Sequence, residues 1–142
     1  MKNKYIDVTQ EAGAALFRRN IQGEIVMLNV LSFREVADYS QNPELAPKKE
    51  ISGAEAFQKY IDHTLPLLKK TNGDIEFLGK GGSYLIGPQD EAWDFIMLIR
   101  QNSLADFMSF SSNEEYLQGL GHRTAAIEDS RLLPLERVTS VI

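Results

Sequence analysis

Asn29 is a polar residue within an apolar segment. The surrounding stretch, Glu24–Phe33, is rich in Ile, Val and Leu. An amide that is buried without hydrogen-bond partners costs about 1–3 kcal/mol, so this side chain must have a hydrogen-bonding role. Two roles fit the pattern: Asn29 binds a ligand in a pocket between a sheet and its helices, or it satisfies a neighbouring loop.

One histidine and one aspartate, His63 and Asp129, are the candidates for moving a proton. An unperturbed imidazole titrates near pH 6.5, about the pH range in which a general base works. His63 lies on the outer side of a predicted helix, where it acts either as a base or as a contact to another subunit or to the loop Asp38–Glu50. His122 follows Gly121 and is predicted to lie in an exposed turn. Asp129 is the second candidate catalytic residue.

Four arginines could bind a carboxylate or a phosphate through their planar guanidinium groups: Arg34, Arg100, Arg123 and Arg131. Such guanidinium groups bind carboxylates and phosphates through two parallel hydrogen bonds. Glu128 and Asp129 are acidic neighbours in sequence, so internal ion pairing is the alternative role of these arginines. The candidate ligand-binding residues are therefore Asn29, Arg34, Arg100 and Arg123.

Other common catalytic motifs are missing from the sequence. The two histidines are far apart, without a His-x-x-x-His pair or a carboxylate triad, and there is no cysteine, so we expect no metal site and no cofactor. The chain has no Gly-x-Ser-x-Gly nucleophile motif. Gly79-Lys80-Gly81-Gly82 lacks the length of a nucleotide-binding loop and is not followed by a helix, so it predicts a glycine bulge or a hairpin tip.

The composition is that of one globular domain. Of 142 residues, 43% are hydrophobic and 25% charged, and 20 acidic against 15 basic side chains give a net charge of −5. Such a chain lacks the electrostatic basis for non-specific binding to nucleic acid or to an anionic membrane. No apolar segment approaches the roughly 18 residues of a membrane span, and no signal-peptide pattern occurs. We therefore expect a cytoplasmic protein with neither nucleic acid nor membrane as a partner.

Capping residues and apolar spacing predict the elements that position these side chains. Helices are predicted from Thr9 to about Asn20, from Ser52 to Asn72-Gly73, from Asn102 or Ser103 onward, and from Asn113 to Gly119 or Gly121. Strands are predicted at Glu24–Phe33, at Asp74–Leu78 with Ser83–Ile86, at Trp93–Arg100, and within Arg123–Leu135.

The helix that begins at Ser52 has a start signal and two apolar stripes. Ser52 and Glu55 have the spacing of a capping box. One stripe is predicted to face the core: Ala54, Phe57, Ile61, Leu65 and Leu68. The opposite stripe contains His63 together with these residues: Ala56, Tyr60 and Leu67.

This order of elements predicts an α+β fold. Residues 1–23 are predicted to form an additional N-terminal helical extension. Residues 24–135 follow the β-α-β-β-α-β order of a ferredoxin-like antiparallel sheet with helices on one face. Both parts belong to a single predicted domain, 1–142. The strands at 24–33 and 93–100 are apolar on both faces. Helices on one side leave the other face uncovered, so we expect a homodimer that packs sheet against sheet.

Four segments carry a resemblance to a known family: MLNVLSFR at 27–34, SGAEAFQKY at 52–60, LIGPQDEAWD at 85–94 and HRTAAIEDSRLLP at 122–134. Over about Glu24 to Pro134 the chain resembles the domain of unknown function 1330 family, within the dimeric α+β barrel superfamily. The resemblance implies a dimeric α+β barrel and groups Arg123, Asp129 and Arg131 as a lock at the last strand. Where the family commonly has Arg-Tyr-Pro-Ser after the third strand, this chain has RQNS at 100–103.

Together these patterns predict a homodimer that binds a small organic molecule or transforms it without a metal. In an enzyme, Asn29 or an arginine would polarise a carbonyl or enolate oxygen, while His63 or Asp129 would move a proton. The alternative is a non-catalytic dimer in which the same residues fix the fold and the assembly.

Overall fold

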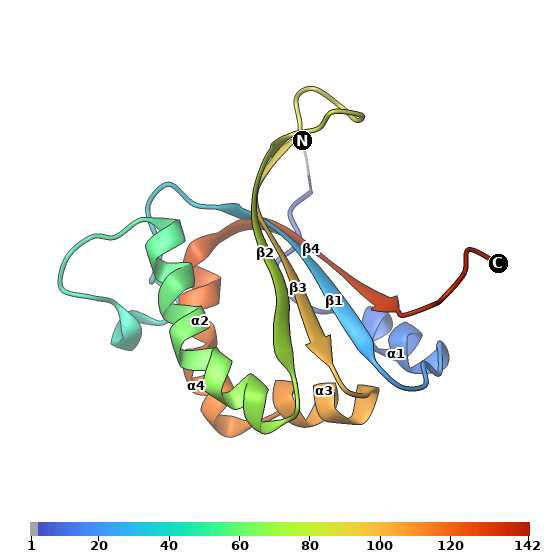
Figure 1. Cartoon of the computed structure of the whole chain (residues 1–142). Helices are drawn as coiled ribbons and strands as arrows, with labels where there is room; N and C mark the ends of the chain where they lie inside the picture. Colours follow the sequence, from blue (N-terminus) through green and yellow to red (C-terminus); the bar gives the residue numbers. More distant parts are fainter. Residues whose placement is uncertain (1–2) are drawn as a thin grey trace.

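A four-stranded antiparallel sheet forms the centre of the molecule in the computed structural model, which describes residues 3–142. Its strands are β1 (Ile25–Phe33), β2 (Asp74–Ser83), β3 (Ala92–Gln101) and β4 (Ile127–Glu136). They lie in the order β2-β3-β1-β4 (Figure 1). This order and the β-α-β-β-α-β succession confirm the predicted ferredoxin-like α+β fold.

The helices pack on one face of this sheet. They are α1 (Gln10–Arg18), α2 (Gly53–Lys70), α3 (Leu104–Ser111) and α4 (Glu114–Ala126). Their caps are the predicted ones: Thr9, Ser52, Ser103 and Asn113 each accept a hydrogen bond from the first turn. Helices α2 and α4 cover one part of the sheet, whereas Leu16 of α1 and Phe107 of α3 pack against Ile25 and Met27.

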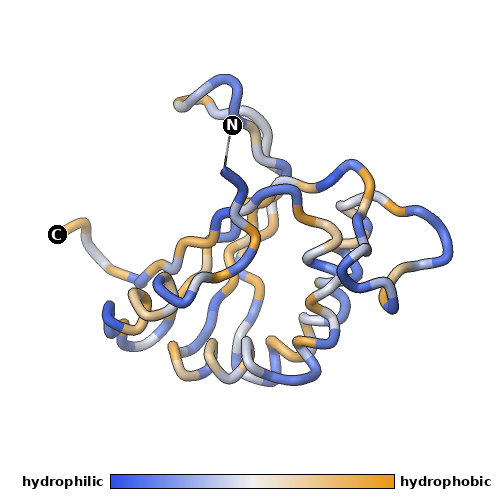
Figure 2. Tube along the Cα trace, turned by 180° about the vertical axis from the view of Figure 1, so that it is seen from behind, coloured by the Kyte–Doolittle hydropathy of each residue, from blue (hydrophilic) through white to orange (hydrophobic). Residues whose placement is uncertain are grey.

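Alternation along β1 separates a covered face from an open face. Ile25, Met27 and Leu31 are buried under the helices, as the two-residue period predicts. The register assigns the following apolar residues to the other side, which we call the open face: Val26, Leu28, Val30, Phe77, Ile96, Leu98, Leu133 and Leu135. Figure 2 shows hydrophobic positions throughout the strands. No helix of the described chain packs on the open face.

Strand β2 continues through its glycines, which corrects the predicted break at Gly79–Gly82. Gly79 and Gly82 are paired with Ile96 and Trp93, and the register shift lies earlier, between Ile75 and Phe77. A Cβ at Gly81 would lie 2.3 Å from the Trp93 carbonyl oxygen, so close backbone approach is the reason for glycine there. Tyr84–Ile86 consequently form part of the hairpin loop instead of a strand.

Helix α4 is longer than predicted because its glycines do not end it. A Cβ at Gly119 would lie 2.1 Å from Cδ2 of His63, and one at Gly121 would lie 2.6 Å from Cδ1 of Leu45. These glycines admit close neighbours, and the helix continues to Ala126. His122 is therefore a helical residue and not part of an exposed turn, and the last strand, predicted within Arg123–Leu135, begins at Ile127.

The position of α4 also changes the buried side of α2. The buried residues of α2 include Ala56, Tyr60 and Leu67, the residues of its predicted outer stripe. Ala54 of the predicted core stripe is exposed. Since α4 packs along the predicted outer side, the core face of α2 is rotated toward it.

Candidate functional site

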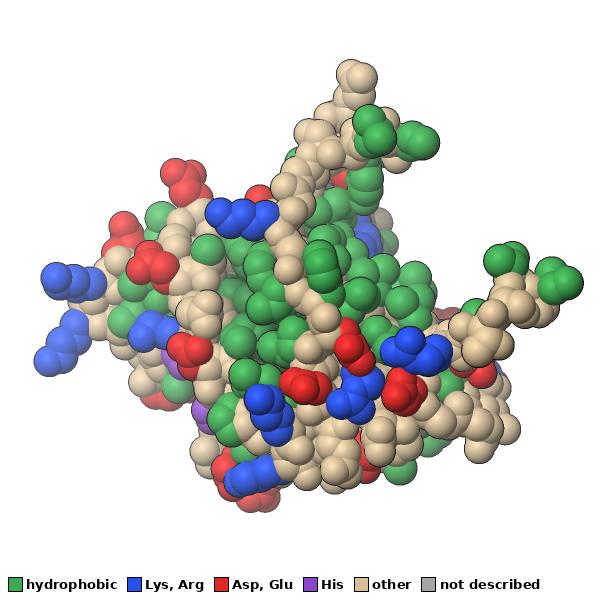
Figure 3. Space-filling model, in the orientation of Figure 1, with side chains coloured by type: hydrophobic (Ala, Val, Ile, Leu, Met, Phe, Trp, Pro, Cys, Tyr) green, Lys and Arg blue, Asp and Glu red, His purple; other side chains and the backbone are tan. Residues whose placement is uncertain are grey.

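The open face is an apolar surface on which no helix of the described residues packs. Hydrophobic side chains gather over the sheet beside β2 (Figure 3). Among them, the exposed fractions of Phe77 and Leu133 are both 53%. Soluble monomers rarely expose contiguous apolar patches larger than a few hundred Å², and such patches mark interaction sites.

Two projecting segments border the open face. The β2–β3 hairpin stands away from the body, and the C-terminal segment leaves the sheet at the end of β4 (Figure 1). The hairpin tip carries Leu85 and Ile86, with exposed fractions of 100% and 92%. The C-terminal segment carries the exposed residues Val138, Val141 and Ile142. Both segments are therefore apolar where they point into solvent.

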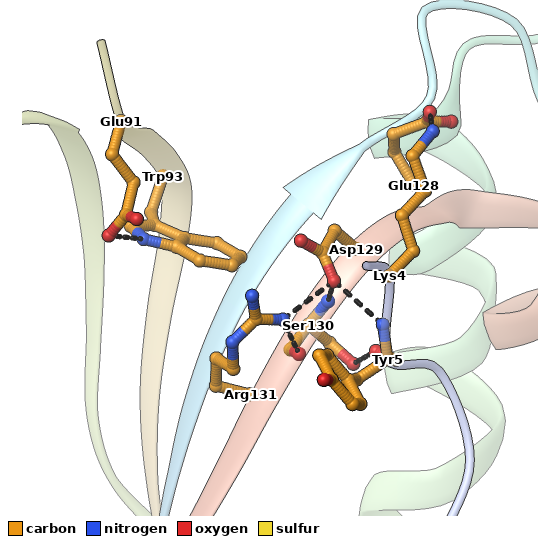
Figure 4. A network of polar contacts seen from close by, with 8 residues as sticks. All are labelled: Lys4, Tyr5, Glu91, Trp93, Glu128, Asp129, Ser130 and Arg131. Atoms are coloured by element: carbon orange, nitrogen blue, oxygen red, sulfur yellow. Dashed lines mark hydrogen bonds and ion pairs between the residues drawn. The ribbon is translucent and has the colours of Figure 1, made fainter. Parts of the chain in front are cut away.

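A polar cluster lies where β4 begins (Figure 4). Asp129 accepts hydrogen bonds from the backbone nitrogens of Tyr5 and Ser130, both at 2.9 Å, and from Nη1 of Arg131 at 2.7 Å. The Ser130 hydroxyl donates to the Tyr5 carbonyl oxygen at 2.5 Å. Lys4 and Glu128 form an ion pair beside them. The cluster holds the N-terminal segment against β4.

The guanidinium group of Arg131 also connects this cluster to the base of the hairpin. It lies over the Tyr5 ring, 4.8 Å from the centroid, and over the Trp93 ring at 5.1 Å. Trp93 is buried, and its indole nitrogen donates to Glu91 at 3.4 Å. Sequence reasoning missed the role of Tyr5, because nothing near residue 5 indicates a partner so distant along the chain.

Asp129 is a poor general base in this setting. Burial alone would raise the pKa of its carboxyl, but the hydrogen bonds from Tyr5, Arg131 and Ser130 outweigh burial and lower that pKa below its ordinary value. A carboxylate held by three donors favours its charged form and accepts a proton weakly. The geometry fits the lock that the resemblance implies, with Asp129 and Arg131 bonded directly and Arg123 holding the Ile6 carbonyl oxygen at 2.8 Å.

We expect Asp129→Asn to destabilise the fold by about 2 kcal/mol at pH 7, because it weakens hydrogen bonds to a charged acceptor. A lowered pKa means that the carboxylate stabilises the fold above the unfolded-state pKa, and that this contribution is lost as the pH falls through the folded-state value. Thermal unfolding from pH 3 to 7 should show the two proteins converging below about pH 4. Asp90→Asn, in the exposed hairpin loop, is the control; a gap between Asp129→Asn and the native chain that is independent of pH would contradict this account.

His63 and His122 both lie along the contact between α2 and α4. Nε2 of His63 is 2.5 Å from the Glu115 carbonyl oxygen, and Nδ1 of His122 is 2.7 Å from the Tyr39 hydroxyl. Burial, followed by the positive charges of Lys59 and His63, lowers the pKa of His122. His63 thus contacts α4, and because a carbonyl oxygen only accepts hydrogen bonds, Nε2 of His63 is the donor in this contact.

The predicted arginines have internal partners. Arg34 pairs with Glu128 at 3.3 Å, and Arg100 pairs with Glu76 at 3.1 Å. Arg123 donates to Ile6, as described above. Within residues 3–142, the buried Nε of Arg34 has no hydrogen-bond partner, so this arginine retains a donor.

Asn29 lies at the centre of β1 on the covered face, between the two groups of buried residues that contain Leu31 and Met27. Its Nδ2 donates to the Met27 carbonyl oxygen at 3.2 Å. The amide oxygen accepts no hydrogen bond from the described residues. In the sheet Asn29 is paired with Met97 and Leu132, so its surroundings are apolar.

Two cavities are defined at the surface. One of about 190 Å³ lies in the loop after β1, between Tyr39 and residues 46–51. The other, of about 320 Å³, lies on the open face and is lined by Val26, Glu76, Leu98, Leu135, Glu136, Arg137 and Val138. Neither of these two cavities is lined by Asn29 or by the predicted ligand-binding arginines.

The described residues contain no candidate metal cluster and no helix that could cross a membrane. Between residues 3 and 142, no three His, Asp or Glu side chains are grouped so that they could hold a metal ion. None of the helices in that range has the length and apolar character needed to cross a membrane.

The chain is similar to the RPA0582 protein of Rhodopseudomonas palustris, a protein of unknown function. In the crystal structure of methylated RPA0582, the sequence is 34% identical to this chain. The alignment covers 99% of this chain and 100% of that chain, with a TM-score of 0.85. A second crystal structure of RPA0582 is also 34% identical, covers 97% and 100% of the two chains, and has a TM-score of 0.83.

Two more distant structures are also similar. The At3g17210 protein of Arabidopsis thaliana is 10% identical, with 85% and 100% coverage and a TM-score of 0.50, which reflects the fold alone. A dimeric protein of unknown function and ferredoxin-like fold from Bacteroides fragilis is 14% identical, with 82% and 99% coverage and a TM-score of 0.49. No family model matches the sequence, so the assignment to domain of unknown function 1330 stays a prediction. No curated protein matches it.

Proposed function

The chain belongs to the same family as the RPA0582 protein of Rhodopseudomonas palustris, and we propose that it functions as a homodimer whose protomers pack open face against open face. The observation that carries the proposal is the uncovered apolar face of the sheet, together with the apolar hairpin tip and C-terminal segment beside it. A two-fold interface must be complementary to itself, and an apolar face meets this condition without any matching of charges. The proposal includes the dimeric α+β barrel implied by the resemblance to domain of unknown function 1330.

Sedimentation velocity over a range of protein concentrations tests this assembly. One chain has a mass of 16.0 kDa, and the dimer is recognised as a species of twice the protomer mass. We expect the dimer to persist at micromolar concentration. A single species with the mass of one protomer at those concentrations would overturn the proposal.

We propose further that each protomer binds a small organic molecule at Asn29. Support comes from the free amide oxygen of Asn29 in an apolar part of the covered face, since ligand sites combine apolar walls with a few polar groups. The internal partners of Arg34, Arg100 and Arg123 favour structural roles for these three residues. A small neutral compound with a hydroxyl or N–H donor therefore fits this site better than an anion does.

Asn29→Leu separates the binding role of Asn29 from a structural role. If Asn29 is kept for a ligand, removing an incompletely paired amide should leave stability unchanged or raise it by up to about 1 kcal/mol. Chemical denaturation of the variant and the native chain measures this. Asn29→Leu should also abolish the thermal shift produced by any neutral hydroxyl or N–H compound that stabilises the native chain. A loss of more than about 1 kcal/mol would show that Asn29 supports the fold instead.

A further inference from the structure

The tip of the β2–β3 hairpin is an apolar group without a contact surface in its own protomer. Tyr84, Leu85 and Ile86 follow one another at the tip, and all three are exposed. Pairing between β3 and β1 begins only at Phe95, so the hairpin beyond that residue is a two-stranded arm. In Figure 1 this arm stands clear of the body. Two consecutive aliphatic side chains that are almost fully exposed indicate a segment that is buried in an assembly.

An apolar groove lies at the opposite end of the open face. This is the cavity of about 320 Å³, whose walls include Val26, Leu98, Leu135 and Val138. Strand β3 runs from the base of the arm at Phe95 toward this groove, and Leu98 lies three residues further on, which corresponds to about 10 Å. The arm points away from the groove. It cannot reach the groove of its own chain without breaking the pairing of β2 with β3.

The symmetry of a face-to-face dimer brings tip and groove together. When two copies of one sheet face each other, their two-fold axis lies in the plane between them. An axis along the strands would place the two arms beside each other and stack groove on groove, so that neither tip could enter a groove. An axis across the strands places the arm end of each sheet over the groove end of the other. Only the second arrangement brings the exposed tip of one protomer to the groove of the other.

We propose that Leu85 and Ile86 of each protomer insert into the Val26–Leu98–Leu135–Val138 groove of the other, so that the dimer is held by reciprocal exchange of the hairpin arms. This inference rests on the proposed open-face dimer and adds the direction of its two-fold axis. The occupant of the groove is a second copy of this chain, since tip and groove lie on the same interface.

Disulfide trapping tests the arrangement cleanly because the chain has no cysteine of its own. The Leu85→Cys/Val138→Cys double variant should form a covalent dimer on mild oxidation, and mass spectrometry should find a disulfide that joins positions 85 and 138 of different chains. A disulfide requires Cα atoms about 4.4–6.8 Å apart, so it reports direct contact. Leu85→Cys/Leu135→Cys provides a second position in the same groove. The control is Leu85→Cys/Leu117→Cys, in which position 117 is an exposed residue of α4, and it should give no 85–117 link.

The outcomes separate this inference from the dimer itself. A link between the two copies of position 85, in Leu85→Cys alone, would place the axis along the strands and overturn arm exchange. A native dimer without any link from position 85 to 135 or 138 would also overturn arm exchange while leaving the open-face dimer standing. A native chain that sediments only as a monomer would overturn both. We also expect Leu85→Ser/Ile86→Ser to raise the dissociation constant of the dimer at least about tenfold. The reason is that each of the two tips loses its apolar contacts with the groove.

Discussion

Replacing Leu133 by glutamate is expected to raise the dissociation constant of the homodimer by about a thousandfold or more, and so to give monomers at micromolar concentration. Leu133 lies on the open face opposite Leu28, and its exposed fraction is 53%. In a two-fold interface each protomer would bring one new carboxylate into an apolar contact. Desolvated charges without partners cost several kcal/mol, and about 1.4 kcal/mol corresponds to a tenfold change in the dissociation constant.

The matched control for this change is Leu117→Glu. Leu117 has a similar exposed fraction, 48%, but lies on α4, away from the open face. Sedimentation velocity should show Leu133→Glu as a monomer and Leu117→Glu as a dimer at the same protein concentration. Both variants should keep the unfolding cooperativity of the protomer, because neither residue is buried. If Leu133→Glu remained a dimer and Leu117→Glu dissociated, the interface would lie on the helical side.

Gly53→Ala is expected to lower the free energy of unfolding more than Asp129→Asn or Asn29→Leu does. Gly53 begins α2 at the point where β1 and α4 end. A Cβ there would lie 2.2 Å from the Arg34 carbonyl oxygen and 2.7 Å from that of Ala126. Both atoms belong to the backbone, and the Gly53 nitrogen already donates to Arg34 at 3.0 Å. Overpacking against atoms that cannot turn away should cost about 3 kcal/mol or more.

The control for Gly53→Ala is Gly13→Ala. Gly13 lies within α1, and the nearest atom to a Cβ there is Cγ1 of Val8 at 4.0 Å. Alanine should stabilise that helix by about 0.5–1 kcal/mol relative to glycine. Calorimetry should therefore show opposite shifts for the two variants, with Gly53→Ala melting about 10 °C lower than the native chain. A Gly53→Ala protein as stable as the native chain would mean that the start of α2 is loosely packed against the ends of β1 and α4.

Local signals predicted most of the fold because each element carries its own start or period. The caps at Thr9, Ser52 and Asn113 and the alternation in β1 are properties of short segments, and the structure contains the elements that they predict. The uncovered face also followed from the alternation, since a sheet with helices on one side cannot bury both of its faces.

The glycines were misinterpreted because their reasons lie in other parts of the chain. Gly119 and Gly121 are typical helix ends in sequence, but His63 and Leu45 press against them from α2 and from the long loop. The glycines therefore allow close packing and do not end α4, which continues to Ala126. The same packing buries the predicted outer stripe of α2.

The polar residues were identified more successfully than their partners. Asp129 and Arg131 form the expected pair, and Glu128 bonds Arg34. The N-terminal segment also belongs to this cluster, through the backbone atoms of Tyr5 and Ile6. Backbone atoms carry no sequence signal, so the sequence could not indicate this contact. For the same reason the sequence could not show that Glu115 engages His63, because the contact is made by its carbonyl oxygen.

The most direct test of the open-face homodimer is isotope-filtered nuclear Overhauser spectroscopy on a dimer that mixes labelled and unlabelled chains. Only contacts between protomers give signals in this experiment. We predict contacts that involve methyl groups of the open face: Val26, Leu28, Val30, Ile96, Leu98 and Leu133. Signals confined to residues of α2 and α4, with none from the open face, would contradict the account.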